Sequence, residues 1–69
     1  SQAIVAARTQ VMHDPSIPAV NKNKELIRIL HDKGIFSIKN AIKQVADTLG
    51  ISRNTVYLHL RSITKEMEQ

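Results

Sequence analysis

The sequence predicts an all-α domain: three helices around a helix-turn-helix, an extra N-terminal helix or linker segment, and no β wing. Three observations predict this fold. Apolar residues recur at helical spacings along most of the 69 residues, and no alternating strand pattern occurs. Gly34 and Gly50, the only glycines, stand where predicted helices stop. Residues 45–57 place small, turn-forming, apolar and capping residues where a helix-turn-helix needs them.

Residues 1–20 are predicted to form a helix or a linker to a missing upstream domain. The break His13–Pro18 follows an apolar stripe. A helix this short cannot hold itself in water, so it must pack on the domain, on a second copy or on an upstream domain. Because the chain starts at Ser1 without a methionine, we expect it to be an excised piece of a longer protein, or one that carries a short cloning remnant. The stripe consists of Ile4, Val5, Ala7, Val11 and Met12.

Residues 21–69 are predicted to form the helix-turn-helix domain, beginning with a scaffold helix. Asn21 or Asn23 is expected to cap this helix, and Lys33 and Gly34 to end it. Phe36 is then expected at the centre of the core. The apolar face of the scaffold helix consists of Leu26, Ile27, Ile29 and Leu30.

The first motif helix is predicted to be capped by Ser37 and to end at Gly50. Ala46 must be small where the two motif helices cross, and Gly50 is expected to adopt a positive φ in the turn. The expected apolar side consists of Ile38, Ala41, Ile42, Val45, Ala46 and Leu49.

The second motif helix is predicted to follow Ser52, which caps it, and to continue toward Met67. Ile51 fills the gap under the turn. The helix directs one side toward the core, where apolar residues recur at i, i+4 and i+7. These residues are Val56, Leu60 and Ile63.

The charge distribution favours a polyanionic partner. The formal net charge is +4, but residues 22–65 hold nine of the ten basic residues and only three acidic ones, so this segment carries about +6. The positive charge therefore belongs to the part of the chain that contains the motif.

The outward face of the second motif helix is the predicted contact with double-stranded DNA. With Val56 inward, this face presents Asn54, Tyr57, Leu58, Arg61 and Lys65. We expect Arg53 and Asn54, in the first turn, to reach base edges in the major groove, with Arg53 suited to guanine and Asn54 to adenine. Leu58 is either a contact for a thymine methyl group or an ordinary surface leucine.

Other residues are expected to hold the DNA backbone. Hydroxyl and cationic side chains suit phosphate oxygens and fix docking without reading sequence. On the second motif helix these are Ser52, Thr55, Tyr57, Arg61 and Lys65, and near the start of the first they are Lys39 and Lys43. His59 leans toward the core and is interpreted as a packed side chain.

The sequence gives no support to an enzyme, a cofactor or a metal site. No Ser, His and Asp set or glycine-rich phosphate loop is present, and the three histidines lack ligand spacing. No apolar run reaches the roughly 20 residues of a membrane span, so a membrane partner is not expected. The lack of cysteine fits the reducing cytoplasm.

The residues also resemble a known family. Lys33–Phe36, Ala41–Ala46 and Leu49–Arg61 are similar to the C-terminal helix-turn-helix domain of YheO-like bacterial transcriptional regulators, over roughly residues 23–61. The resemblance implies an upstream PAS-like sensor domain and DNA binding by this domain. Asn40 departs from the small residue, often glycine, of that family.

Two readings of the function compete with this one. Residues 50–61 also resemble the DNA-binding domain of serine-type site-specific recombinases. Alternatively, Tyr57, Leu58 and Arg61 form a docking patch of a three-helix protein-interaction module. We favour a regulator that binds a two-part operator as a homodimer, because two half-sites give useful specificity over a genome.

Overall fold

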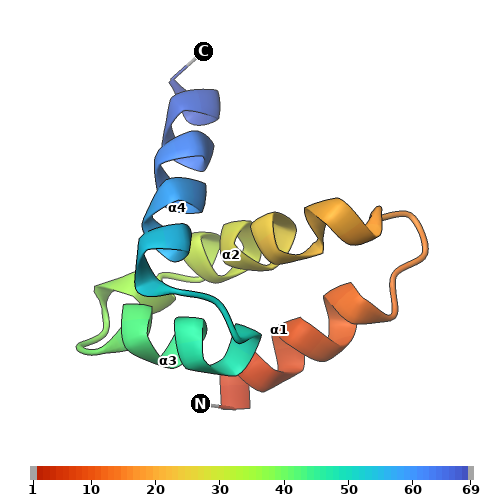
Figure 1. The fold of residues 1–69 in the computed structure, drawn as a ribbon, viewed down its shortest axis with the longest axis horizontal. Helices are drawn as coiled ribbons and strands as arrows, with labels where there is room; N and C mark the ends of the chain where they lie inside the picture. Colours follow the sequence, from red (N-terminus) through yellow and green to blue (C-terminus); the bar gives the residue numbers. More distant parts are fainter. Residues whose placement is uncertain (1, 69) are drawn as a thin grey trace.

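The computed structural model describes residues 2–68, which form four α-helices and no strand (Figure 1). The all-α fold with an extra N-terminal helix is therefore confirmed. None of these helices is long and apolar enough to cross a membrane. The helices are α1 (Gln2–Met12), α2 (Lys22–Asp32), α3 (Ala41–Leu49) and α4 (Arg53–Met67), and two 3₁₀ turns, η1 (Ala19–Asn21) and η2 (Ile35–Ser37), flank α2.

All four helices contribute to one aliphatic core. Helix α1 packs against α2 and α3, and α4 packs against α2 and α3. The N-terminal segment is thus a helix that shares the core of the motif. The buried residues of this core are Ile4, Ala7, Val11, Leu26, Ile27, Leu30, Val45, Ala46, Val56 and Ile63.

Helix α1 divides its predicted apolar stripe between the core and solvent. Ile4, Ala7 and Val11 are buried, whereas Val5 and Met12 are exposed. The Lys22 ammonium joins the end of this helix to α2 by donating to the carbonyl oxygens of Val11, at 3.1 Å, and Asp14, at 3.0 Å. A cation suits the Val11 carbonyl because the last carbonyls of a helix carry the negative end of its dipole.

The start of α2 corrects the expected cap. Asn21 occupies the N-cap position, but neither Asn21 nor Asn23 supplies a side-chain capping bond. The backbone of Asn21 is near-helical, with φ −100° and ψ −4°, since η1 runs directly into α2. An N-cap side chain folds back onto the first turn most easily from an extended backbone, which this turn does not provide. The predicted stop is confirmed, because Gly34 adopts φ +78° after the helix ends.

The segment between α2 and α3 differs most from prediction. Helix α3 begins at Ala41, so Ser37 does not cap it; the Ser37 hydroxyl donates instead to the carbonyl of Gly34 at 2.7 Å. Ile38 is exposed, and Phe36 is half-buried at the edge of the core rather than at its centre. The 3₁₀ turn η2 ends at Ser37, and residues 38–40, for which a helical first turn was predicted, form a non-helical turn.

Asn40 has a left-handed backbone, with φ +65°, immediately before α3. Glycine adopts this conformation freely, and asparagine tolerates it better than most residues. The departure of Asn40 from the small residue of the resembling family is therefore compatible with the turn.

The turn between α3 and α4 confirms the predicted chemistry. Gly50 adopts φ +68°, and the amide of Ile51 donates to the carbonyl of Ala46 at 3.1 Å, as in a Schellman motif. The Ser52 hydroxyl then accepts the amide of Thr55 at 3.1 Å and caps α4. Val56 and Ile63 are buried, and Leu60 packs against the core.

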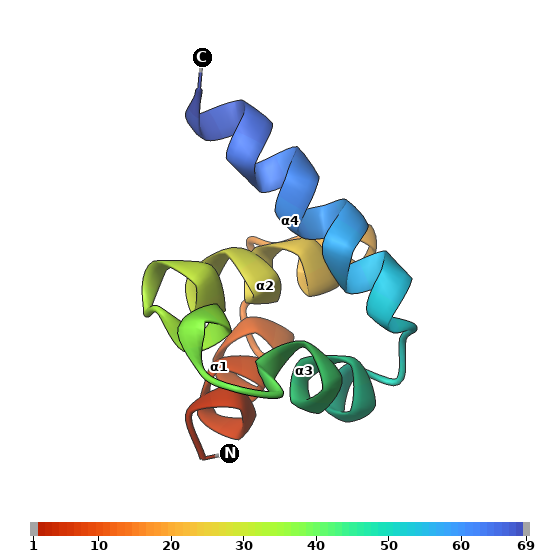
Figure 2. The ribbon, with the colours of Figure 1, turned by 90° about the vertical axis from the view of Figure 1, so that its left-hand side faces the viewer.

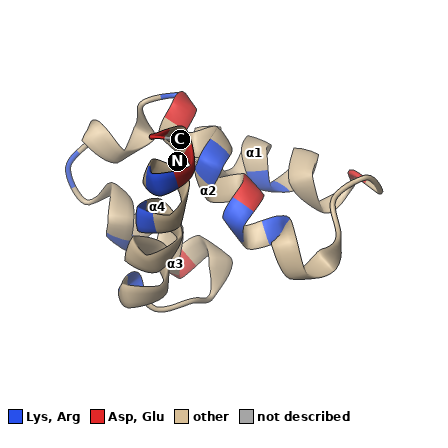
Figure 3. Cartoon of the chain, turned by 90° about the horizontal axis from the view of Figure 1, so that it is seen from above, with Lys and Arg blue, Asp and Glu red and all other residues tan. Residues whose placement is uncertain are grey.

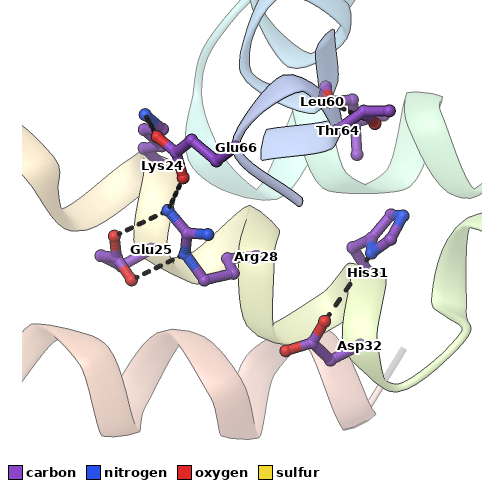
Figure 4. A network of polar contacts seen from close by, with 8 residues as sticks. All are labelled: Lys24, Glu25, Arg28, His31, Asp32, Leu60, Thr64 and Glu66. Carbon is purple, nitrogen blue, oxygen red and sulfur yellow. Dashed lines mark hydrogen bonds and ion pairs between the residues drawn. The ribbon is translucent and has the colours of Figure 1, made fainter. Parts of the chain in front are cut away.

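Helix α4 extends beyond the rest of the molecule at its C-terminal end (Figure 2). Its start lies beside α3, and its later turns cross α2 (Figures 1 and 2). One flank of α4 is joined to α2 through Glu66, whose carboxylate lies 2.6 Å from the Lys24 ammonium and 2.6 Å from the Arg28 guanidinium (Figure 4). The opposite outer face of α4 carries the predicted DNA-contacting residues.

Candidate nucleic-acid interface

The outward face of α4 is open to solvent, as its spacing predicts. Asn54, Tyr57, Leu58, Arg61 and Lys65 are all exposed, and more than half of the surface of Tyr57 and Leu58 is accessible. Arg61 and Lys65 have no ion-pair partner among residues 2–68. The face thus combines an amide, two large apolar surfaces and two free cations on one helix.

Ser52 and Thr55 lie at the N-terminal end of this helix. Their hydroxyl oxygens are 2.9 Å apart, and the Ser52 oxygen also accepts the Thr55 amide. In such a pair one hydroxyl donates to the other, which leaves one O–H proton for an outside acceptor. The cap therefore keeps a hydrogen-bond donor at the end of the helix that faces the turn.

A cavity of about 250 Å³ lies between the start of α3 and the first two turns of α4. It brings together three of the predicted site residues, Lys43, Arg53 and Tyr57, and no acidic side chain lines it. We refer to it as the α3–α4 cavity. Its lining residues are Ile38, Asn40, Ala41, Ile42, Lys43, Arg53 and Tyr57.

The two predicted lysines near α3 occupy different surroundings. Lys39 is exposed in the turn before the helix and does not line the cavity. Lys43 lines the cavity and also lies 3.6 Å from the Asp47 carboxylate, one helical turn on. Because both partners of this pair are largely exposed, it holds the Lys43 ammonium only weakly.

Two basic residues of α2 are paired within the domain. The hydrogen bonds from Lys24 and then from Arg28 hold the pKa of Glu66 below its usual range, and the bond to Glu66 raises the pKa of Arg28. Arg28 also bonds to Glu25 at 3.2 Å (Figure 4). Figure 3 shows basic residues on α2 as well as on α4. Lys24 and Arg28 on α2 are bonded to Glu66, whereas the cations on the outward face of α4 have no ion-pair partner among residues 2–68.

His59 faces the α2 side of α4 and is half-buried. Burial lowers the pKa of His59, and the nearby Lys24 charge lowers this pKa further. Both effects favour the neutral form of the ring.

Sequence reasoning did not identify Ile38 and Asn40 as site residues. Helical periodicity placed Ile38 on the core side of α3, whereas the structure puts it in a turn beside Arg53 and Tyr57. The only available signal was Asn40 itself, since asparagine is one of the few residues besides glycine that accept a left-handed backbone.

The chain is similar to known proteins at two levels. Residues 3–61 match a family model described as an HTH domain. Over 68 residues the chain is 43% identical to an uncharacterized protein of Haemophilus influenzae, and over 52 residues it is 48% identical to the uncharacterized protein YheO of Escherichia coli K12. A YheO protein of Shigella flexneri shows the same identity over 52 residues.

These matches cover most of the chain but a small part of each relative. The Haemophilus match spans 99% of this chain and 31% of that protein, whereas the YheO matches span 75% of the chain and 22% of the relative. The chain therefore corresponds to less than a third of the length of these relatives. No solved structure matches it significantly.

Proposed function

Since this chain belongs to the helix-turn-helix domain family, with YheO-like proteins as its relatives, we propose that it is the sequence-specific DNA-binding domain of a bacterial transcriptional regulator. Helix α4, over about residues 52–63, is the recognition helix in the major groove. The observation that carries the proposal is the outward face of α4, where free cations and an exposed amide occupy the surface that a recognition helix presents to DNA.

Base recognition is proposed for the first half of that face. The Asn54 amide suits the N6 and N7 atoms of adenine, and a good bidentate pair discriminates by roughly 1–3 kcal/mol. Leu58, exposed one turn further on, suits the methyl group of thymine. Arg53, beside Asn54 in the sequence, is included among the DNA-binding residues.

Backbone contacts are proposed for the residues around this strip. Arg61 and Lys65 lie further along α4, where the helix leaves the groove and approaches a phosphate strand. The hydroxyl donor of the N-terminal cap and the cations near α3 suit the strand on the other side. The set consists of Lys39, Lys43, Ser52, Thr55, Tyr57, Arg61 and Lys65.

We further propose that the whole protein binds a two-part operator as a homodimer in the bacterial cytoplasm. A single recognition helix makes few base contacts, and two half-sites about one helical turn apart supply the missing specificity. The relatives are more than three times as long as their matched segment, which supports a further domain, and we propose an upstream sensor.

The test is selection from a random duplex library, followed by titration of the selected and a scrambled duplex over a salt series. We expect a selected sequence, and an affinity that falls steeply with salt because bound phosphates release counterions. Enrichment of a palindrome supports the dimer, and a single half-site means that the isolated domain binds alone. Loss of binding with salt without any base preference contradicts sequence-specific recognition. Absence of DNA binding favours the protein-interaction module, whose exposed patch contains Tyr57 and Leu58.

A further inference from the structure

The α3–α4 cavity joins two cations to an apolar wall on the proposed DNA face. We infer that this cavity binds one phosphate of the DNA backbone with its adjoining deoxyribose, and that Arg53 holds this phosphate rather than reading a base. The inference rests on the proposed function and refines it. It gives Arg53 a different role from the one that its place in the first turn of α4 predicts.

The charge of the cavity selects an anion. Arg53 and Lys43 enter it from different helices, and its lining contains no carboxylate. The one acidic partner nearby, Asp47, lies 3.6 Å from Lys43 in an exposed pair that a phosphate can displace. Arginine and lysine from two elements can therefore approach the same phosphate from two sides.

The backbone at the start of α3 supplies further donors. The amide of Ala41 donates to the carbonyl of Ile38 at 3.1 Å, and the amide of Gln44 donates to the carbonyl of Asn40 at 3.0 Å. The amides between them, at Ile42 and Lys43, have no protein acceptor among residues 2–68. Both belong to residues that line the cavity. Unbonded amides at a helix start suit an anion, and here they reinforce the two side-chain cations.

The apolar part of the lining indicates more than a bare ion. Ile38 is 57% exposed and Tyr57 is 57% exposed, and both line the cavity. A free phosphate gains nothing from these surfaces. The carbon face of a deoxyribose attached to the bound phosphate covers them, which removes apolar area from water.

The helical position of Arg53 separates it from the base-reading strip. At 100° per residue, Arg53 lies about 60° around the helix axis from the buried Val56, whereas Asn54 lies about 160° away. Asn54 thus points outward, while Arg53 and Tyr57 share the flank that borders α3, where both line the cavity. A side chain on this flank meets the groove wall, which is phosphate, before it meets the base edges.

The test combines two Arg53 variants with neutral phosphates in the selected duplex. Arg53→Ala is expected to weaken binding to every duplex about tenfold and to leave the base preference unchanged. Arg53→Lys is expected to retain much of the affinity and all of the preference, because the lysine ammonium keeps the positive charge that holds a phosphate. Asn54→Ala is the matched control and is expected to alter the preference at one base. Urea unfolding of each variant checks that the domain remains folded.

Methylphosphonate substitution then identifies the phosphate. Each backbone position is neutralised in turn, and one position per half-site is expected to weaken wild-type binding about tenfold yet have no further effect on Arg53→Ala. In NMR spectra, the amide resonances of Ile42 and Lys43 are expected to shift when the unmodified duplex is added. They are expected to shift much less when the duplex carries a methylphosphonate at the identified position.

Two results overturn the assignment while leaving the proposed function intact. One is a changed base preference in Arg53→Ala or Arg53→Lys, and the other is an equal loss at every methylphosphonate position in wild type and Arg53→Ala. Failure of the wild-type domain to bind any duplex overturns the proposed function and this assignment together.

Discussion

Among residues 2–68, Glu66 makes the polar contacts that span the most residues along the chain. Its carboxylate bonds to Lys24 and Arg28, which are 42 and 38 residues away in the chain, and so connects the last turn of α4 to α2. No local sequence pattern predicts such a pairing, because the sequence does not show which residues of α2 lie beside the end of α4. Only the tertiary fold distinguishes these cations from those on the outward face of α4.

The pKa of Glu66 makes part of the stability dependent on pH. Because its pKa is lower in the folded chain than its ordinary value of 4.5, the carboxylate favours folding. This contribution is complete above about pH 4.5 and disappears as the pH falls through the lower folded pKa. We expect Glu66→Gln to lower the melting temperature at pH 7, and the difference from wild type to shrink as the pH falls below 4.5, as followed by circular dichroism.

Glu68→Gln is the matched control for that experiment. Glu68 lies two residues further on and takes part in no ion pair among residues 2–68. Its substitution is expected to leave the melting temperature close to wild type over the same pH range. A difference between Glu66→Gln and wild type that stays unchanged as the pH falls through the acid range would show that the carboxylate charge is not its cause.

Two positive-φ residues show what sequence reasoning resolves at single positions. The positive φ of Gly50 was predicted because a glycine between two stretches of helical apolar spacing is typical of a turn. The observed φ is +68°. Asn40 was not predicted as a turn, since asparagine is also common at caps and on helix surfaces. Its left-handed backbone, φ +65°, moved the start of α3 to Ala41 and brought Ile38 to the surface.

At the scale of the helices, α4 was the most predictable element and α1 the least. The spacing of Val56, Leu60 and Ile63 specifies a single buried side, and Ser52 marks the start of α4. Helix α1 is apolar on more than one side, so its sequence does not state which residues meet the domain. The packing shows that Ile4 is buried and Val5 is not.

We therefore expect α1 to be required for the stability of the domain. Ile4→Ala is expected to lower the free energy of unfolding by about 2–4 kcal/mol, because it leaves a cavity among α1, α2 and α3. Val5→Ala, on the same helix but exposed, is expected to change it by less than about 0.5 kcal/mol. Urea denaturation measures both. Equal small effects would mean that α1 does not pack on the domain in solution.

Across the whole molecule, five of the ten basic residues fall into two groups that net charge does not distinguish. Lys22 binds the end of α1, and Lys24 and Arg28 bind Glu66, so these three stabilise the fold. Arg61 and Lys65 are exposed on the outward face of α4 without a partner among residues 2–68. The sequence identifies the basic segment, but it does not distinguish the cations that are bonded within the fold from those that are exposed.

This division predicts different salt dependences for two lysine variants. Lys65→Ala is expected to reduce the slope of log affinity against log salt by about 1, because one phosphate contact is lost. Lys24→Ala is expected to leave the slope unchanged, since that ammonium is held by Glu66. Fluorescence anisotropy of a labelled duplex at several salt concentrations measures both slopes. A reduction as large for Lys24→Ala would place α2 on the DNA.

The exposed position of Tyr57 has a practical consequence for spectroscopy. The chain has one tyrosine and no tryptophan, and this tyrosine lies on the rim of the α3–α4 cavity rather than in the core. Incorporation of fluorotyrosine therefore places a single fluorine label on the proposed DNA face. Its one ¹⁹F resonance reports on the occupancy of that surface, free of overlap from any aromatic probe elsewhere in the domain.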